Sequence, residues 1–111
     1  MTELAKKRCI PCEGSTKPLT PAEAEALLPK LDARWKLINA GTRIEAVFEF
    51  KNYFRTTAFI NAVAWVAHQE DHHPDINFGY KTATVSYSTH AIGGLSENDF
   101  ICAAKVDALL M

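Results

Sequence analysis

Residues 42–71 read TRIEAVFEFKNYFRTTAFINAVAWVAHQED, and this stretch decides the fold because its hydrophobic period changes partway along. From Thr42 to Phe50, apolar and polar residues alternate with a period of two, which is typical of a half-buried strand. From Tyr53 to Asp71 neither Gly nor Pro interrupts, and apolar residues recur at spacings of three and four, which favours an amphipathic helix. The stretch therefore predicts a strand of a sheet followed by a long helix.

The apolar surface of this helix is wider than one packed face requires. One set of apolar residues with helical spacing is Phe54, Ala58, Ala62, Trp65 and Val66. A second set carries the apolar surface further around the helix: Phe59, Ile60, Val63 and Ala67. We expect one face to cover the sheet and the remainder to meet a partner subunit.

The flanking sequence predicts the remaining elements. Before the stretch, a first helix starts with Thr20 as cap, Pro21 in the first position and Glu23 closing a capping box. A short strand, Trp35 to Ile38, then forms a hairpin with the alternating strand across a turn at Asn39, Ala40 and Gly41.

After the stretch, strands are expected over Ile76–Phe78 and Thr82–Thr89, and a last helix begins after Ser96. The order is helix, two strands, helix, two strands, helix. It predicts an α+β fold in which a four-stranded antiparallel sheet has three helices packed on one face.

Composition indicates one ordinary globular domain over residues 1–111, in which residues 1–18 form an N-terminal arm. The chain is 48% hydrophobic and 23% charged with a net charge of −1, and it has no Lys/Arg-rich patch that would indicate direct nucleic-acid binding. The longest apolar run, Ala62 to Ala67, is too short to span a membrane. Because the charged N-terminus is not followed by an apolar signal segment, we expect a cytoplasmic location.

The three cysteines give a weak signal. Cys9 and Cys12 form a C-x-x-C pair, which is found in redox sites and in half of many zinc sites. No strand precedes the pair and no second C-x-x-C follows, so we expect ordinary thiols in an N-terminal arm. Cys102 is expected to be a small core residue of the last helix.

Histidines mark the candidate site. His68, His72 and His73 lie within six positions, and His72 and His73 stand in the segment Asp71-His72-His73-Pro74-Asp75. Pro74 disfavours a helical conformation at the preceding residue, so the paired imidazoles are predicted at the end of the long helix. The fourth histidine, His90, is predicted to continue the polar face of the last strand.

Three interpretations of this cluster remain open. The histidines could be surface residues favoured by the helix dipole. His68 and His72, at i and i+4, could instead bind zinc with Asp71 or His90, although the glutamate of an H-E-x-x-H is absent. In the third interpretation, histidines at different places around one substrate act as general acid and base without a metal, and Asp71 orients an imidazole or holds a polar substrate edge.

With these residues the sequence resembles the pterin-4a-carbinolamine dehydratases, also described as dimerization cofactors of a homeodomain transcription factor. The matching pieces are the helix 54–71, His72-His73-Pro74-Asp75-Ile76, Ser88-Thr89-His90, residues 94–100 and residues 103–107. The N-terminal Cys9-x-x-Cys12-Glu13-Gly14, Pro18-Leu19 and Trp35 are similar to the bacterial-type members. One departure concerns His68, which stands where many members carry a glutamate.

The resemblance implies the same α+β fold and the dehydration of 4a-hydroxytetrahydropterin to quinonoid dihydropterin, in the recycling of tetrahydrobiopterin. It implies that His72, His73 and His90 are catalytic, with His72 and His90 as acid–base groups and His73 holding the pterin. Further substrate contacts are expected from a set around these histidines: His68, Asp71, Ser88 and Thr89. No metal and no organic cofactor is expected, because the pterin is the substrate.

The resemblance also implies a homodimer or homotetramer. The alternative function, from a different class, is a non-catalytic dimerization cofactor or regulatory protein-binding module. Such a module would use the broad apolar surface of the long helix to bind a protein partner.

Overall fold

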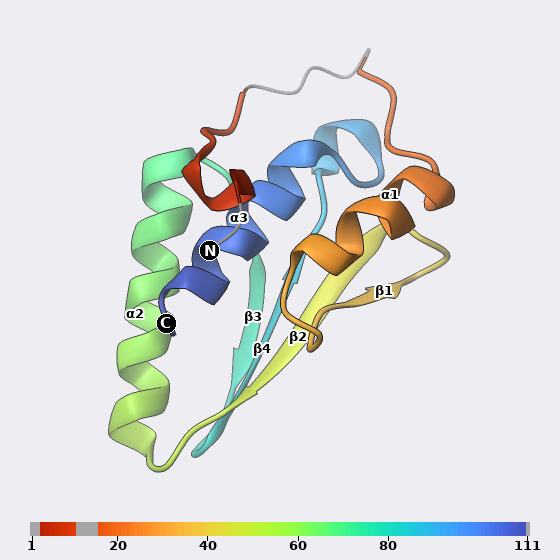
Figure 1. The fold of residues 1–111 in the computed structure, drawn as a ribbon. Helices are drawn as coiled ribbons and strands as arrows, with labels where there is room; N and C mark the ends of the chain where they lie inside the picture. The colour runs from red at the N-terminus through yellow and green to blue at the C-terminus, as the bar shows by residue number, and fades with distance from the viewer. Residues whose placement is uncertain (1–2, 11–15, 111) are drawn as a thin grey trace.

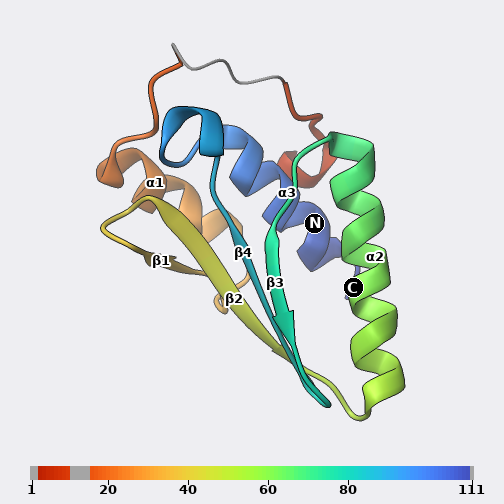
Figure 2. The ribbon, with the colours of Figure 1, turned by 180° about the vertical axis from the view of Figure 1, so that it is seen from behind.

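The structure, a computed structural model, describes residues 3–10 and 16–110 of the chain. Its elements are η1 (Glu3–Lys6), α1 (Pro21–Leu27), η2 (Leu28–Lys30), β1 (Lys36–Ile38), β2 (Arg43–Glu49), α2 (Tyr53–Glu70), β3 (Asp75–Phe78), β4 (Thr82–Tyr87), η3 (His90–Ile92) and α3 (Glu97–Ala108). The strands form one antiparallel sheet in the order β1-β2-β4-β3. The three α-helices lie on one face of it (Figures 1 and 2). The predicted fold class and element order are confirmed.

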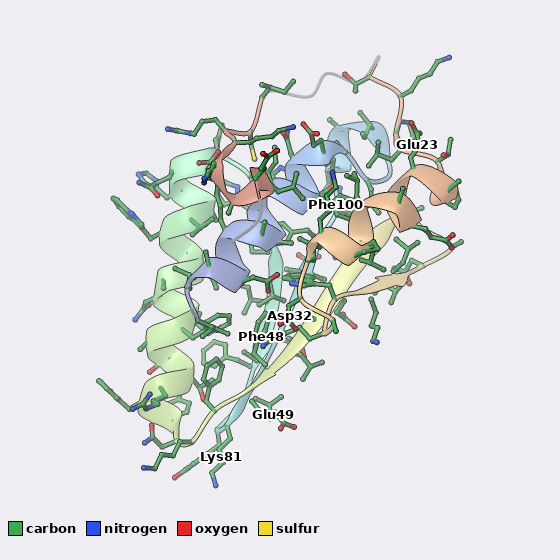
Figure 3. All side chains as sticks on the ribbon, viewed as in Figure 1. Glu23, Asp32, Phe48, Glu49, Lys81 and Phe100 are labelled. Carbon is green, nitrogen blue, oxygen red and sulfur yellow. The ribbon has the colours of Figure 1, made fainter. Side chains whose placement is uncertain are left out.

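The strand and helix of the deciding stretch form for local reasons. Along β2, Ile44, Ala46 and Phe48 are buried, whereas Val47 and Glu49 face outward. Figure 3 shows Phe48 between β2 and the helices and Glu49 projecting away from them. Lys51 and Asn52 then separate the strand pattern from the helix pattern, and α2 begins directly after its capping residue, Asn52.

Asn52 caps α2, because its side-chain oxygen accepts a hydrogen bond of 2.9 Å from the backbone N–H of Arg55. The cap fixes where the helix starts. The buried residues of α2 are Thr56, Phe59, Val63, Val66 and Ala67. The ring of Phe59 lies 4.7 Å from that of Phe48, measured between centroids.

Most of the first apolar set of α2 stays outside the core. Phe54 is 78% exposed and Trp65 is 60% exposed, although both belong to the set with the more regular helical spacing. Only Val66 of that set is buried. The periodicity could not choose between the two faces, because it does not include the position of the sheet. The sheet instead buries the face that carries Phe59, Val63 and Ala67.

Trp35 joins the first hairpin to the last helix. Its indole is buried, and its Nε1–H donates a hydrogen bond of 2.8 Å to Asp107 of α3. Burial raises the pKa of the Asp107 carboxyl, although hydrogen bonds from Asp32 and Trp35 oppose the shift. The ring of Trp35 also packs at an edge-on angle against Phe48. This contact closes the core at the β1 side of the sheet.

The N-terminal segment packs on α3 (Figure 1). Leu4 of η1 is buried in the hydrophobic core, and Lys105 of α3 donates a hydrogen bond of 2.8 Å to the carbonyl of Ala5. The described part of the predicted arm is thus held against the domain. Cys12, the second cysteine of the C-x-x-C pair, lies outside the described residues.

The last strand ends earlier than the alternating pattern predicts. β4 stops at Tyr87, and Thr89 then donates a backbone hydrogen bond of 2.7 Å to Gly94, which closes a short loop around η3. His90 therefore begins a 3-10 turn and does not continue the strand face, so its predicted placement is wrong. Gly93 permits this loop because it adopts a φ of +66°.

Among the helices of the described residues, none combines the length and apolarity that crossing a bilayer requires.

A matched pair of valines, Val63 on α2 and Val47 on the outer face of β2, tests whether the Val63 face of α2 is packed in the core. Val63→Ala removes two methyl groups from a fully buried site, so we expect the free energy of unfolding to fall by about 2–3 kcal/mol. The same change at Val47, which is half exposed on the outer face of β2, is expected to cost less than about 1 kcal/mol. Urea denaturation measures both. Equal losses would contradict the assignment of the packed face.

Candidate active site

A cavity of about 510 Å³ opens where α2 ends, β4 ends and α3 begins. Six of the seven residues that the sequence singles out line it: Asp71, His72, His73, Ser88, Thr89 and His90. They come from two segments that are separate in the chain, and Asn98 of α3 adds a third wall. The N-terminal segment contributes Cys9 and Ile10. The fold therefore brings most of the predicted site residues together.

The end of α2 directs the paired histidines toward this cavity. Asp71 adopts a left-handed conformation with a φ of 50°, and the N–H of His72 then donates a hydrogen bond of 3.2 Å to Ala67. This bond is the long backward contact of a Schellman-type helix ending. Pro74 prevents the helix from resuming. His72 and His73 consequently lie outside the helix, in the segment between α2 and β3.

A buried carboxylate holds His72. The Nε2 atom of His72 lies 2.6 Å from Oδ1 of Asp99, whose side chain is fully buried. The imidazole itself is only 12% exposed. A carboxylate can only accept, so Nε2 carries the hydrogen and donates it. In the neutral imidazole, Nδ1 is then the nitrogen that carries the lone pair.

The other oxygen of Asp99 belongs to a buried hydrogen-bond network. Oδ2 accepts from the Thr89 hydroxyl at 2.8 Å and from the backbone N–H of Ser96 at 2.9 Å. The Ser96 hydroxyl lies 2.8 Å from that of Thr89 and donates to it, since the Thr89 hydrogen is already given to Asp99. The loop after β4 and the start of α3 are fixed through this one residue.

Tyr87 lies under the imidazole of His72. The two rings are stacked with an interplanar angle of 4° and a centroid separation of 5.9 Å. Burial raises the pKa of Tyr87, so the ring remains neutral. Its hydroxyl has no hydrogen-bond partner within the part of the chain that the structure describes. The tyrosine therefore acts as a flat apolar support for His72.

His73 and His90 face the cavity from opposite segments and are both exposed. His73 follows His72 in the segment after α2, and His90 starts η3 in the loop after β4. Their exposure contrasts with the enclosed position of His72. The three imidazoles thus divide into one held by a buried carboxylate and two open to a ligand.

His68 lies elsewhere. It is exposed on α2, its ring is 5.5 Å from that of Trp65, and it is not among the described residues that line the cavity. The zinc interpretation requires His68 and His72 one helical turn apart, but α2 ends at Glu70 between them. Within residues 3–10 and 16–110, no group of three or more metal-binding side chains is assembled.

Sequence reasoning missed four wall or support residues: Cys9, Glu70, Asn98 and Asp99. Glu70 accepts a hydrogen bond of 2.8 Å from the N–H of Cys9. Burial pushes the pKa of Glu70 upward, but that hydrogen bond together with Lys105 and Arg8 outweighs it, so the pKa is lowered. Asp99 had a readable signal, because it shares a helix face with apolar residues of α3, where a carboxylate requires a partner.

These features define a small α+β domain with a histidine-lined cavity at one end of its sheet. The family model for pterin 4 alpha carbinolamine dehydratase matches residues 17–109. The chain belongs to this family, which confirms the resemblance read from the sequence.

Relatives from two Nitrosomonas species are similar over almost the whole chain. A protein of Nitrosomonas eutropha is 62% identical over 98% of this chain and 95% of its own length. One from Nitrosomonas europaea is 58% identical over 96% of this chain and 93% of its own length. Both carry the name "Putative pterin-4-alpha-carbinolamine dehydratase". The expected class of enzyme, a dehydratase, agrees with these relatives.

Two solved structures are similar in fold. A transcriptional coactivator/pterin dehydratase from Brucella melitensis is 30% identical, with a TM-score of 0.79 over 84% of this chain and 98% of that chain. A pterin dehydratase-like protein described as a RuBisCO assembly factor in the alpha-carboxysome is 29% identical. Its TM-score is 0.62, over 70% of this chain and 90% of that chain.

A matched pair of amide substitutions tests the role of Asp99. In the wild-type chain both oxygens of Asp99 accept hydrogen bonds. In Asp99→Asn one of them becomes an NH₂ group, which faces either Nε2 of His72 or the Thr89 hydroxyl and the Ser96 N–H. We expect the free energy of unfolding to fall by about 2–3 kcal/mol. Glu97→Gln makes the same change two residues earlier, where the carboxylate is half exposed and pairs with Lys7, so a loss below about 0.5 kcal/mol is expected. Chemical denaturation of both variants decides. An unchanged stability in Asp99→Asn would contradict the network.

Proposed function

We propose that this chain removes water from 4a-hydroxytetrahydropterin and yields quinonoid dihydropterin. One observation carries the proposal: three histidines meet in one cavity, and one of them is oriented by a buried carboxylate. Family membership supports the choice of a pterin as substrate. The reaction requires one proton to be delivered and another to be taken away at neighbouring atoms, which suits imidazoles at different places around a ring.

In this proposal His72 is the base. Asp99 accepts from Nε2–H, so Nδ1 is free to take the proton from N5 of the pterin. The electron pair of the N5–H bond then forms the double bond between N5 and C4a. Asp99 stabilises the imidazolium that results, as a carboxylate does for the histidine of a catalytic triad.

His90 is the proposed acid. It gives a proton to the hydroxyl at C4a, the C4a–O bond breaks with its electron pair, and water leaves. His73 is exposed in the cavity wall and is assigned to hold and polarise the pterin near C4a. Asp71, Ser88 and Thr89 also line the cavity, and we assign them to polar contacts with the substrate. Each step uses side chains of this chain alone.

The reaction would serve the recycling of tetrahydrobiopterin after aromatic amino acid hydroxylation, in the cytoplasm.

The test is the rate at which 4a-hydroxytetrahydropterin, generated in situ by a hydroxylase, loses water. Quinonoid dihydropterin is followed by absorbance. The wild-type chain is expected to accelerate the reaction, and His72→Ala and His90→Ala are each expected to reduce that acceleration by about 10²-fold or more. His73→Ala is expected to act mainly on KM, because it removes a binding contact.

His68→Ala is the matched control. It removes an imidazole, as the cavity variants do, but from the surface of α2, beside Trp65 and outside the cavity lining. We expect its kcat/KM to stay within about threefold of wild type. Folded protein without acceleration over the spontaneous reaction would exclude the proposed activity. A large loss in His68→Ala alone would return this residue to the substrate contacts.

A second proposal concerns assembly. We infer that α2 pairs with α2 of a second copy through the apolar stripe Phe54, Ala58, Ala62 and Trp65. Its aromatic residues are exposed at opposite ends, with small alanines between them. A two-fold interface matches a patch with itself, so antiparallel pairing would place Phe54 of one protomer beside Trp65 of the other. The Brucella protein is described as a transcriptional coactivator and the carboxysome protein as a RuBisCO assembly factor, so another protein is the competing occupant of this stripe.

Light scattering after size exclusion separates these possibilities. The wild-type chain at micromolar concentration is expected to have a multiple of the monomer mass, and Trp65→Glu is expected to have the monomer mass because it buries a charge in the interface. Val47→Glu, on the outer face of the sheet, is expected to behave as wild type. A monomeric wild-type chain would contradict the proposal and leave the stripe to a different protein.

A further inference from the structure

Two cysteine thiols meet behind the cavity wall. The Sγ atoms of Cys9 and Cys102 lie 3.5 Å apart, although 93 positions separate them in the chain. Cys102 of α3 is completely buried, whereas Cys9 is partly exposed and lines the cavity. The proposed dehydration uses neither sulfur.

Several independent contacts hold the two sulfurs together. The N–H of Cys9 donates to Glu70 at 2.8 Å. The next residue, Ile10, donates its N–H to Asn98 at 3.1 Å and accepts from the Asn98 side chain at 2.5 Å. The backbone on both sides of the thiol is thus fixed to α2 and α3. A disulfide bond measures about 2.05 Å between sulfurs, so the two sulfurs, already in contact, must approach each other further for the bond to form.

The two thiols differ in reactivity. Cys9 lies 3.7 Å from the carbonyl of Asn98 and donates its S–H there, so the Cys102 S–H points at the Cys9 sulfur. This hydrogen bond from Cys102 to Cys9, and then burial, raises the pKa of Cys102. Cys102 is therefore kept as a thiol and shielded from solvent. Of these two thiols, Cys9 is the one that an oxidant in solution can reach.

We propose that Cys9 and Cys102 form a reversible disulfide with a small-molecule disulfide such as glutathione disulfide, and that this bond fastens the N-terminal segment to the cavity wall. The Cys9 thiolate attacks one sulfur of glutathione disulfide and releases one glutathione thiolate. Cys102 then loses its proton, its thiolate attacks the Cys9 sulfur, and the second glutathione leaves. The net change converts two protein thiols and one glutathione disulfide into one protein disulfide and two glutathione thiols.

The bond would add a covalent link to a segment whose surface ion pairs are weak. The ion pair of Arg8 with Glu70 has an arginine side chain that is 74% exposed, and that of Lys7 with Glu97 is half exposed on both sides. Such pairs contribute about 0–1 kcal/mol each. The reduced segment can open locally, and the disulfide prevents this, so oxidation sets how freely the wall formed by Cys9 and Ile10 moves. This inference stands on the thiol geometry and does not depend on the pterin reaction.

The first experiment maps the disulfide. Folded wild-type chain is equilibrated with mixtures of reduced and oxidised glutathione in EDTA, quenched with acid, alkylated and digested. We expect a linked pair of peptides that contain Cys9 and Cys102 and that dithiothreitol separates. Cys12→Ser, which leaves only these two cysteines, is expected to form the same bond. Cys9→Ser is the control and cannot form it.

The second measurement follows trypsin cleavage after Lys7 and Arg8, both exposed just before Cys9. Oxidised Cys12→Ser is expected to be cut there roughly tenfold more slowly than its reduced form, because cleavage requires local opening. The rate at which trypsin cuts Cys9→Ser is expected to be the same under oxidising and reducing conditions. A wild-type chain that pairs Cys9 with Cys12 would overturn the proposal. So would a Cys12→Ser chain that keeps glutathione on Cys9, forms only dimers between chains, or is cut equally fast in both states.

Discussion

The contact between His72 and the buried carboxylate of Asp99 is the interaction on which the functional end of the molecule depends. A fully buried carboxylate is costly unless it is hydrogen-bonded, and Asp99 meets donors from three places in the chain. They are the segment after α2, the loop after β4 and the start of α3. Because all three converge on one residue, the positions of the cavity walls are coupled. The sheet and the helices form the core, and Asp99 holds together the segments that surround the cavity.

The location of the cavity follows from where secondary structure ends. α2, β4 and α3 all terminate or begin there, so each leaves backbone groups without a partner inside its own element. The capping interaction at Ser96 and the left-handed residue Asp71 meet this need locally. Side chains released from regular structure at these ends then line the cavity. The N-terminal segment closes the remaining side through Glu70 and Asn98.

Sequence reasoning succeeded where the physics is local. The alternation along β2, the capping box of α1, the Ser96 cap of α3 and the helix ending before Pro74 depend on residues only a few positions apart, so the fold could be predicted. It failed where contacts are distant. Which face of α2 is buried depends on the sheet, and the partner of His72 lies 27 positions away. His90 was misplaced because the pairing of Thr89 with Gly94 ends the strand. The site residues were found by type, and their arrangement was not.

Asp99 divides its work between its two oxygens. Oδ2 accepts from Thr89 and Ser96 and so holds the loop and the helix start, whereas Oδ1 accepts from His72 alone among the contacts that the structure gives it. One oxygen therefore maintains the fold and the other orients an imidazole. The imidazole of His72 is hydrogen-bonded to Asp99 and stacked on the ring of Tyr87, so it loses little freedom when a ligand enters. Preorganisation of His72 is thus a property of the folded chain itself and does not depend on a bound ligand.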